Sequence, residues 1–239
     1  MKFNRKVVII ILKVLVACEE SQRVCEAFRR RGCEAYSADL IDCSGGHPEW
    51  HIQGDVIPII NGHCSFKTND GVLHTIDSEW DLIIAHPPCT YLTNSGSLWF
   101  NIEKYGDKAR QRYKDREKAV EFFMQFVNAN CKHIAIENPV GHMSSAYRKP
   151  DCIYNPYDFV GETECKKTCL WLKGLKPLKS NRGGQELPEE QRTHNGFKGH
   201  FGDKCYGWNN PECSRLRSQT PIGVAEAMAE QWIKEIKGE

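Results

Sequence analysis

The stretch DLIIAHPPCTYLTNSG, residues 81–96, decides the fold class. Its opening apolar run, residues 81–85, is typical of a strand buried on both faces of a parallel sheet. Packing explains that run, but it does not explain why the chain continues through His86 and two prolines to Cys89. In an open parallel sheet, ligands bind beside the carboxyl ends of the strands, so the pattern predicts a functional loop at this position.

Apolar runs alternate with helical patterns through the first half of the chain. Besides 81–85, strands are predicted at residues 7–17, 34–40, 50–56 and 133–137, and helices at 21–32 and 107–130. This order predicts an α/β fold with an open, mostly parallel, Rossmann-like sheet and helices on both faces.

The second half of the 239-residue chain has a different composition. Residues 151–217 are rich in proline, glycine, asparagine, lysine and cysteine, with one strand predicted at 168–172 and an extended loop at 181–204. A closing helix is predicted from about Pro221, since proline is favoured in a first helical turn.

Net charge and cysteine content limit which binding partners and which cellular compartment the sequence allows. A net charge of +1 leaves nucleic-acid binding open, because a local basic face can exist within a neutral total. Twelve cysteines without dense, regular spacing favour free thiols in a reducing cytoplasm. The N-terminus resembles a secretory or lipoprotein signal, but Lys13 interrupts its short apolar run. We therefore predict a buried first strand and no membrane association.

Reactive side chains follow two of the predicted strands. If 81–85 and 133–137 pair directly, about 4.8 Å apart, Cys89 and Glu137 face one small ring together. An ionised thiol is strongly nucleophilic, and the prolines before it limit the geometries of its loop. The pair therefore suggests covalent catalysis. Taken separately, Cys89 also fits a buried strand-end thiol and Glu137 a capping or salt-bridging acid.

The other strand ends carry acids that suit an adenosine cofactor. An acid ending the second strand, here Asp39, commonly accepts hydrogen bonds from a ribose, and Asp55 could meet an adenine amino group. The first turn, ACEESQRV, lacks glycine, so a dinucleotide fingerprint fails. Glu19 and Glu20 would repel a pyrophosphate, whereas these two acids would attract the cationic ammonium and sulfonium groups of a different adenosine cofactor.

Taken together, these segments resemble the C5-cytosine DNA methyltransferase family. IIAHPPCTYLT (83–93) is similar to its Pro-Pro-Cys nucleophile loop, IENPVG (136–141) to its Glu-Asn motif, and QTPIGVAEAMA (219–229) to its closing helix motif. The resemblance spans roughly residues 14–172 and 215–232. It is closest to the short methyltransferase-like proteins often encoded by phages and mobile elements.

The resemblance implies methyl transfer from S-adenosylmethionine to C5 of cytosine in DNA. Cys89 would add to C6 while Glu137, in its acid form, hydrogen-bonds N3, and the base must be flipped out or single-stranded. The resemblance also implies a catalytic domain (1–172 and 215–239) and a short loop-rich insert (173–214) in place of a target-recognition domain. The implied catalytic residues are Cys89, Glu137, Pro88 and Lys167, and the implied cofactor-binding residues are Cys18, Glu19, Asp39, Leu40, Asp55, Pro87 and Ala225.

The sequence departs from the family pattern in two places. Where the family has an arginine-rich motif, this chain has CKKTCLWL (165–172), with Lys166, Lys167 and Thr168 as candidates, and lysine does not replace a bidentate arginine. The insert is short for base readout, which needs about 1,000 Å². The short insert therefore predicts relaxed or very short sequence specificity, or a substrate smaller than duplex DNA. Two alternatives stay open: the same chemistry on a free pyrimidine nucleotide or with another transferred group, and a catalytically silent nucleic-acid-binding relative.

The cysteines of the second half are candidate metal ligands. Their spacing is loose compared with zinc-finger patterns, so no metal is predicted. The weak candidates are Cys165, Cys169, His200, Cys205 and Cys213. Nearby basic residues either face phosphate or form a solvated face.

Overall fold

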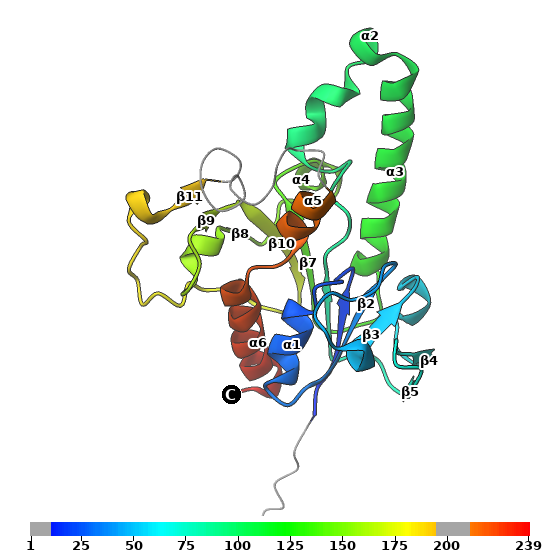
Figure 1. Cartoon of the computed structure of the whole chain (residues 1–239), viewed down its shortest axis with the longest axis vertical. Helices are drawn as coiled ribbons and strands as arrows, with labels where there is room; N and C mark the ends of the chain where they lie inside the picture. Colours follow the sequence, from blue (N-terminus) through cyan, green and yellow to red (C-terminus); the bar gives the residue numbers. More distant parts are fainter. Residues whose placement is uncertain (1–10, 195–210) are drawn as a thin grey trace, which may run out of the picture.

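The computed structural model describes residues 11–194 and 211–239. Its centre is a seven-stranded sheet in the order β3-β2-β1-β6-β7-β10-β8 (Figure 1). β10 runs antiparallel to β7 and β8, and the other pairings described in this sheet are parallel. The prediction of an open, mostly parallel sheet is confirmed. The strands are β1 Lys13–Ala17, β2 Glu34–Asp39, β3 His51–Gln53, β6 Leu82–Ala85, β7 Ile134–Pro139, β8 Cys152–Tyr154 and β10 Thr168–Lys173.

Helices cover both faces of this sheet, as predicted. α1 (Arg23–Arg29) and α6 (Ile222–Lys237) lie on one face and α3 (Asp107–Val127) on the other (Figure 1). Successive strand residues point to opposite faces. Val14 and Val16 accordingly pack with α1 and α6, whereas Leu15 packs in the cluster that contains the phenylalanines of α3.

Smaller elements surround the sheet. β4 (Cys64–Lys67) and β5 (Leu73–Ile76) form a hairpin, and β9 (Glu164–Cys165) pairs with β11 (Thr193–His194). The short helices are α2 Ile102–Tyr105, α4 Met143–Ala146 and α5 Pro211–Ser218, with 3₁₀ turns η1 Pro48–Trp50, η2 Ile57–Ile59, η3 Asn94–Phe100, η4 Pro156–Asp158 and η5 Glu189–Gln191. η3, α2 and the outer part of α3, which begins at Asp107, project beyond the sheet as an arm (Figure 1).

Several predicted boundaries were wrong. The first strand begins at Lys13 within the described residues, and residues 7–10 lie outside them. The third strand ends at Gln53 instead of reaching Asp55, and the long helix ends at Val127. Pro221 is the N-cap of α6, not a first-turn residue; its carbonyl accepts the first backbone bonds of the helix.

The single strand predicted for the second half was also incomplete. β8, β9, β11 and α5 accompany β10 there. β8 has three residues, of which only Tyr154 is buried, so no periodic pattern marks it. The β4–β5 hairpin was missed for the same reason, because Leu73 and its neighbours on the outer face are exposed. Among the residues that the structure describes, no helix is long and apolar enough to cross a membrane.

Candidate active site

The carboxyl ends of β6 and β7 bring a histidine and a glutamate together. The two strands pair in parallel with Ala85 opposite Ile136, which confirms the predicted direct pairing. The next residue of each strand is therefore His86 and Glu137. His86 Nδ1 lies 3.4 Å from Glu137 Oε2, and the hydroxyl of Tyr154 donates to the same oxygen at 3.2 Å. The His86 and Glu137 side chains are only 12% and 14% exposed.

The His86–Glu137 pair is arranged to carry opposite charges. Burial opposes ionisation of Glu137, but the hydrogen bond from His86 and the cations of His86 and Lys166 hold its pKa below the ordinary value. Burial also opposes the imidazolium, yet Glu137 and Glu19 hold the pKa of His86 above its ordinary value. Both directions favour a carboxylate at Glu137 and an imidazolium at His86. Donation from the acid form of Glu137 to the base stays a prediction.

The Cys89 thiol lies close enough to Glu137 for the charge of the carboxylate to affect its pKa. Its side chain is half-buried, and this burial raises the pKa of the thiol. Lys166 and Arg217 lower that pKa, whereas the charge of Glu137 raises it. The Lys166 ammonium also donates to the Arg217 carbonyl at 2.8 Å, which joins the segment before β10 to α5. Of the adjacent lysines, Lys166 faces this site and the predicted catalytic residue, Lys167, is exposed.

The loop that carries Cys89 is fixed from β7. Asn138 Nδ2 donates to the Pro87 carbonyl at 2.8 Å, and both residues are buried, whereas Pro88 is exposed. Leu92 and Thr93 donate backbone bonds to the Cys89 carbonyl. Thr93 also forms a bridge with Gly141 beyond β7. This approach requires glycine, because a Cβ on residue 141 would lie 2.0 Å from the Leu92 carbonyl oxygen.

Two arginines of α3 hold the same loop from the arm. Arg112 donates to the Thr90 carbonyl at 2.9 Å, and Arg116 donates to the Tyr91 carbonyl at 3.0 Å. Both guanidinium groups also lie over the ring of Phe100 in η3. The position of the arm is thereby coupled to that of the Cys89 loop.

The glycine-free turn after β1 uses non-glycine residues in left-handed conformations. Cys18 and Gln22 both have φ of 60°, a region that costs a side-chain-bearing residue about 1–2 kcal/mol. This geometry directs the Glu19 carboxylate to the first amides of α1, where it accepts from Val24 N at 2.7 Å and Cys25 N at 3.1 Å. Glu19, which we predicted to bind a cofactor, therefore caps a helix.

Glu20 is the acid of this turn that has an oxygen able to bind a ligand. It is 8% exposed, and its Oε1 is buried without a hydrogen-bond partner among the described residues. The same oxygen lies 3.9 Å from Arg215 Nη1 of α5. A buried carboxylate oxygen without a hydrogen bond is costly, so it favours a ligand that brings a cationic donor.

The remaining predicted acids gather beside Glu20. Burial raises the pKa of Asp39, and the charge of Glu20 adds to this rise. Burial likewise raises the pKa of the Cys18 thiol, with contributions from Asp39 and Asp55. The described residues thus form an acidic region at the ends of β1 and β2 and after β3, and Leu40 is exposed next to it. These carboxylate acceptors fit an adenosine cofactor that carries an ammonium and a sulfonium.

Other predicted site residues lie elsewhere. Ala225 is 1% exposed in the core cluster shared by α1 and α6, so it packs the fold. Cys169 is buried on the α3 side of the sheet, whereas Cys165 lies in β9. His200, Cys205 and the side chain of Cys213 lie outside the described residues. Within the described part of the chain, no cluster of three metal-ligating side chains occurs. The division into catalytic domain and insert stays a prediction.

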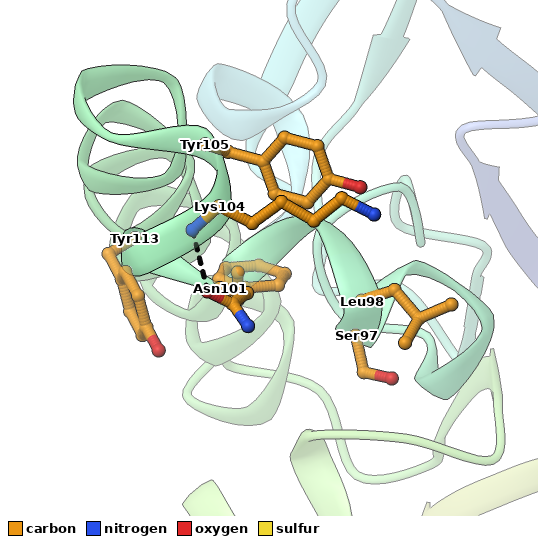
Figure 2. A pocket seen from close by; sticks show the side chains of 7 residues that line it. Ser97, Leu98, Asn101, Lys104, Tyr105 and Tyr113 are labelled. Carbon is orange, nitrogen blue, oxygen red and sulfur yellow. Dashed lines mark hydrogen bonds between the residues drawn. The ribbon is translucent and has the colours of Figure 1, made fainter.

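The arm carries a shallow pocket with a volume of about 530 Å³. Figure 2 shows Tyr105, Lys104 and Leu98 along one side and Tyr113 at the other. The lining residues are Ser97, Leu98, Phe100, Asn101, Lys104, Tyr105 and Tyr113. Next to it, Trp99 is 55% exposed with its ring 5.0 Å from that of Tyr105. Sequence reasoning missed this surface, as it missed His86 and Tyr154, although the histidine before the two prolines was a visible signal.

Comparisons with known proteins give a distant match. No family model matches the chain, and no curated protein matches its sequence. Among solved structures, the methyltransferase EhMeth of Entamoeba histolytica is similar with a TM-score of 0.41 at 13% sequence identity. The alignment covers 84% of this chain and 62% of that one, so the chain spans about three fifths of the length of EhMeth.

Proposed function

We propose that the protein transfers a methyl group from S-adenosylmethionine to C5 of cytosine in DNA, through a bond between Cys89 and C6 of the base. The observation that carries this proposal is that the charges of Glu137 and Lys166 both act on the Cys89 thiol, near the carboxyl ends of two paired parallel strands. A nucleophile and a proton-handling carboxyl around one ring are what addition to C6 requires.

The side chains have distinct roles in this reaction. The Cys89 thiolate adds to C6, and the electron pair moves through C5 and C4 to N3, where Glu137 delivers a proton. The cations of Lys166 and Arg217 favour the thiolate that burial opposes. After C5 has gained its methyl group, loss of the C5 proton to water re-forms the C5–C6 double bond. That step expels the thiolate and returns the N3 proton to Glu137.

The acidic region is the proposed cofactor site. Bound S-adenosylmethionine supplies a methyl group activated by its sulfonium. Glu20 offers its buried oxygen to a cationic group, and Asp39 offers hydrogen-bond acceptors to a ribose. Asp55 and Cys18 complete the region. We do not include Glu19 or Ala225, since one caps α1 and the other packs the core.

The arm supports DNA as the substrate over a free nucleotide. Trp99 exposes its aromatic ring beside the half-buried ring of Tyr105, and Lys104 lies over the Tyr105 ring. Aromatic platforms with nearby cations bind unstacked bases and phosphates of single-stranded nucleic acid. Arg112 and Arg116 join the arm to the Cys89 loop, so we propose that a polymer bound on the arm extends to that loop.

The proposal is tested with methyl-labelled S-adenosylmethionine and purified protein. Separate reactions contain DNA, dCMP or no acceptor, and digestion of the DNA identifies the labelled base. We expect label in 5-methylcytosine from DNA and none in dCMP. Label in dCMP would instead support the free-nucleotide alternative. If neither acceptor is labelled and the protein still retards DNA on a gel, the proposed enzymatic function is wrong, and the protein is a catalytically silent nucleic-acid-binding relative.

Asp39→Ala is expected to weaken S-adenosylmethionine binding by about 10-fold or more, since a hydrogen bond to a charged group contributes about 1.5–3 kcal/mol. Isothermal titration calorimetry measures the dissociation constant. Asp107→Ala removes an exposed acid at the start of α3 and is the matched control. An unchanged dissociation constant in Asp39→Ala would move the adenosine site away from β2.

Trp99→Ala is expected to weaken binding of single-stranded DNA by about 10-fold, because base stacking contributes about 1–3 kcal/mol per base. Fluorescence anisotropy with a labelled oligonucleotide measures the affinity. Leu73→Ala removes a comparably exposed side chain on the β4–β5 hairpin and controls for lost apolar surface. Equal affinities of the two variants would contradict a role of the arm in DNA binding.

A further inference from the structure

We propose that the pocket of the arm binds one unstacked base of the DNA strand that carries the target cytosine, with Asn101 donating a hydrogen bond to the edge of that base. This inference rests on the proposed function and deepens it, because it adds a second base that the protein contacts. The rings that line the pocket, the charge around it and its connection to the Cys89 loop favour this occupant.

The lining of the pocket suits a nucleobase, which has an apolar face and a polar edge. Phe100 is buried and packs edge-to-face against Tyr113, with ring centroids 5.0 Å apart. Tyr105 is half-buried on the opposite side, and Lys104 Nζ lies 5.2 Å from the centroid of its ring (Figure 2). The volume of about 530 Å³ falls within the range of small-ligand sites, about 300–1,000 Å³.

Asn101 gives the pocket a directed hydrogen-bond donor. Its Oδ1 accepts from the backbone amide of Lys104 at 2.9 Å, which is the bond that caps α2. This bond fixes the side-chain amide, so that Nδ2 points away from the cap (Figure 2). Because the side chain is exposed, Nδ2 can donate to an acceptor on the edge of a bound base.

The segment that forms the pocket is positively charged. Residues 94–118 contain seven lysines and arginines against four aspartates and glutamates, whereas the whole chain has a net charge of only +1. A local basic excess of this kind attracts phosphates. The charge therefore favours a strand of nucleic acid over an apolar segment of another protein as the occupant.

Phe100 connects the pocket to the Cys89 loop. Its ring lines the pocket, and the guanidinium carbons of Arg112 and Arg116 lie 5.1 and 3.3 Å from the ring centroid. The same two guanidinium groups donate to the two backbone carbonyls that follow Cys89. One layer of side chains thus joins the pocket to the nucleophile loop, so we assign the bound base to a nucleotide near the target. A single contacted base fits the very short sequence specificity that the insert predicts.

Oligonucleotides with a single abasic site test this inference. Each is an oligothymidylate with one cytosine, and each lacks the base at one of the three positions on either side of that cytosine. Fluorescence anisotropy measures their affinity for the wild-type protein. We expect a position at which loss of the base weakens binding about 10-fold, because base–aromatic stacking is lost there. Equal affinities for the intact and all abasic oligonucleotides would overturn the inference.

Tyr105→Ala assigns the sensitive position to the pocket. Without the Tyr105 ring, the protein is expected to bind the intact oligonucleotide and the one that is abasic at this position with equal affinity. Leu73→Ala, which removes an exposed side chain on the β4–β5 hairpin, is expected to keep the wild-type difference. If the full difference persists in Tyr105→Ala, the base is bound outside the pocket and the inference is wrong.

Asn101→Ser tests the contact with the edge of the base. Serine caps a helix about as well as asparagine, so α2 is kept while Nδ2 is removed. Difluorotoluene at the sensitive position has the shape of thymine but accepts hydrogen bonds weakly. Wild-type protein is expected to prefer thymine over difluorotoluene about 5-fold, and Asn101→Ser is expected to bind both equally. An unchanged preference in Asn101→Ser would contradict the role of Asn101.

Binding and methyl transfer, measured on the same oligonucleotides, separate this inference from the proposed function. A sensitive position that depends on Tyr105, in a protein that transfers no methyl group, keeps the pocket and defeats the proposed function. Methyl transfer to the cytosine without any sensitive position keeps the proposed function and defeats the pocket. A dimer that dissociates in Tyr105→Ala on sedimentation, with equal binding of all oligonucleotides, would assign the pocket to a second copy of the chain and overturn the inference.

Discussion

Replacing Cys89 with serine is expected to lower methyl transfer by about 10⁴-fold or more, because removing an essential nucleophile eliminates the covalent route. A serine hydroxyl ionises far less readily than a thiol, so the cations of Lys166 and Arg217 that favour the thiolate cannot rescue it. The sulfur is assigned to the base and not to the acidic region after β1. S-adenosylmethionine binding is therefore expected to be unchanged in Cys89→Ser.

The covalent bond is measured directly with DNA that contains 5-fluorocytosine. After methyl transfer, the C5 position of this base holds fluorine in place of hydrogen, so the elimination that expels Cys89 is blocked. Wild-type protein is expected to stay attached to the DNA on a denaturing gel, and Cys89→Ser is expected to run free. Cys64→Ser, which changes another half-buried thiol on β4, is the control. An adduct in Cys89→Ser would remove Cys89 from the mechanism.

The sheet was predictable because its central strands carry a strong local pattern. Residues of β6 and β7 are apolar on consecutive positions, which indicates burial on both faces of a parallel sheet. The placement of Cys89 and Glu137 near the same edge of the sheet followed once those strands were paired, since Cys89 follows β6 and Glu137 lies in the second half of β7. Short edge elements such as β8 were not predictable, because three residues contain no period.

The details of the site depend on contacts between distant segments. Tyr154 of β8 donates a hydrogen bond to Glu137, and the charge of Lys166, in the segment before β10, acts on Cys89. No local sequence pattern around these residues indicates which partner each one has. Glu19 and Glu20 are adjacent in sequence and both follow the left-handed Cys18. Glu19 caps α1, whereas Oε1 of Glu20 has no hydrogen-bond partner in the part of the chain that the structure describes. Sequence reasoning treated these two acids alike for that reason.

Replacing Glu137 with glutamine is expected to lower methyl transfer by about 100-fold or more, since an amide cannot deliver a proton to N3 as a carboxyl group can. The amide retains the size of the side chain and can still accept from Tyr154, so the loss measures proton handling and not packing. Transfer rates with labelled cofactor, compared between Glu137→Gln and wild type at saturating DNA, measure the effect.

The same substitution is expected to reduce stability in a pH-dependent manner. The raised pKa of His86 contributes stability that is fully present below its unfolded value of 6.5 and is lost as pH rises through the folded pKa. The lowered pKa of Glu137 contributes stability that is present above 4.5 and is lost as pH falls through its folded pKa. The wild-type advantage in melting temperature over Glu137→Gln is therefore expected to be largest between these two values and to shrink in alkaline buffer.

Thermal denaturation across this pH range checks the stability effect, with the double variant His86→Gln/Glu137→Gln as its control. Breaking a buried pair by removing one partner costs about 3–5 kcal/mol when the other charge remains, and less when that group neutralises. Because Glu137→Gln leaves His86 without its carboxylate, removing the histidine as well is expected to recover part of the loss in acidic buffer. A melting-temperature difference that is constant with pH, and a double variant no more stable than Glu137→Gln, would show that these two side chains are not an ion pair.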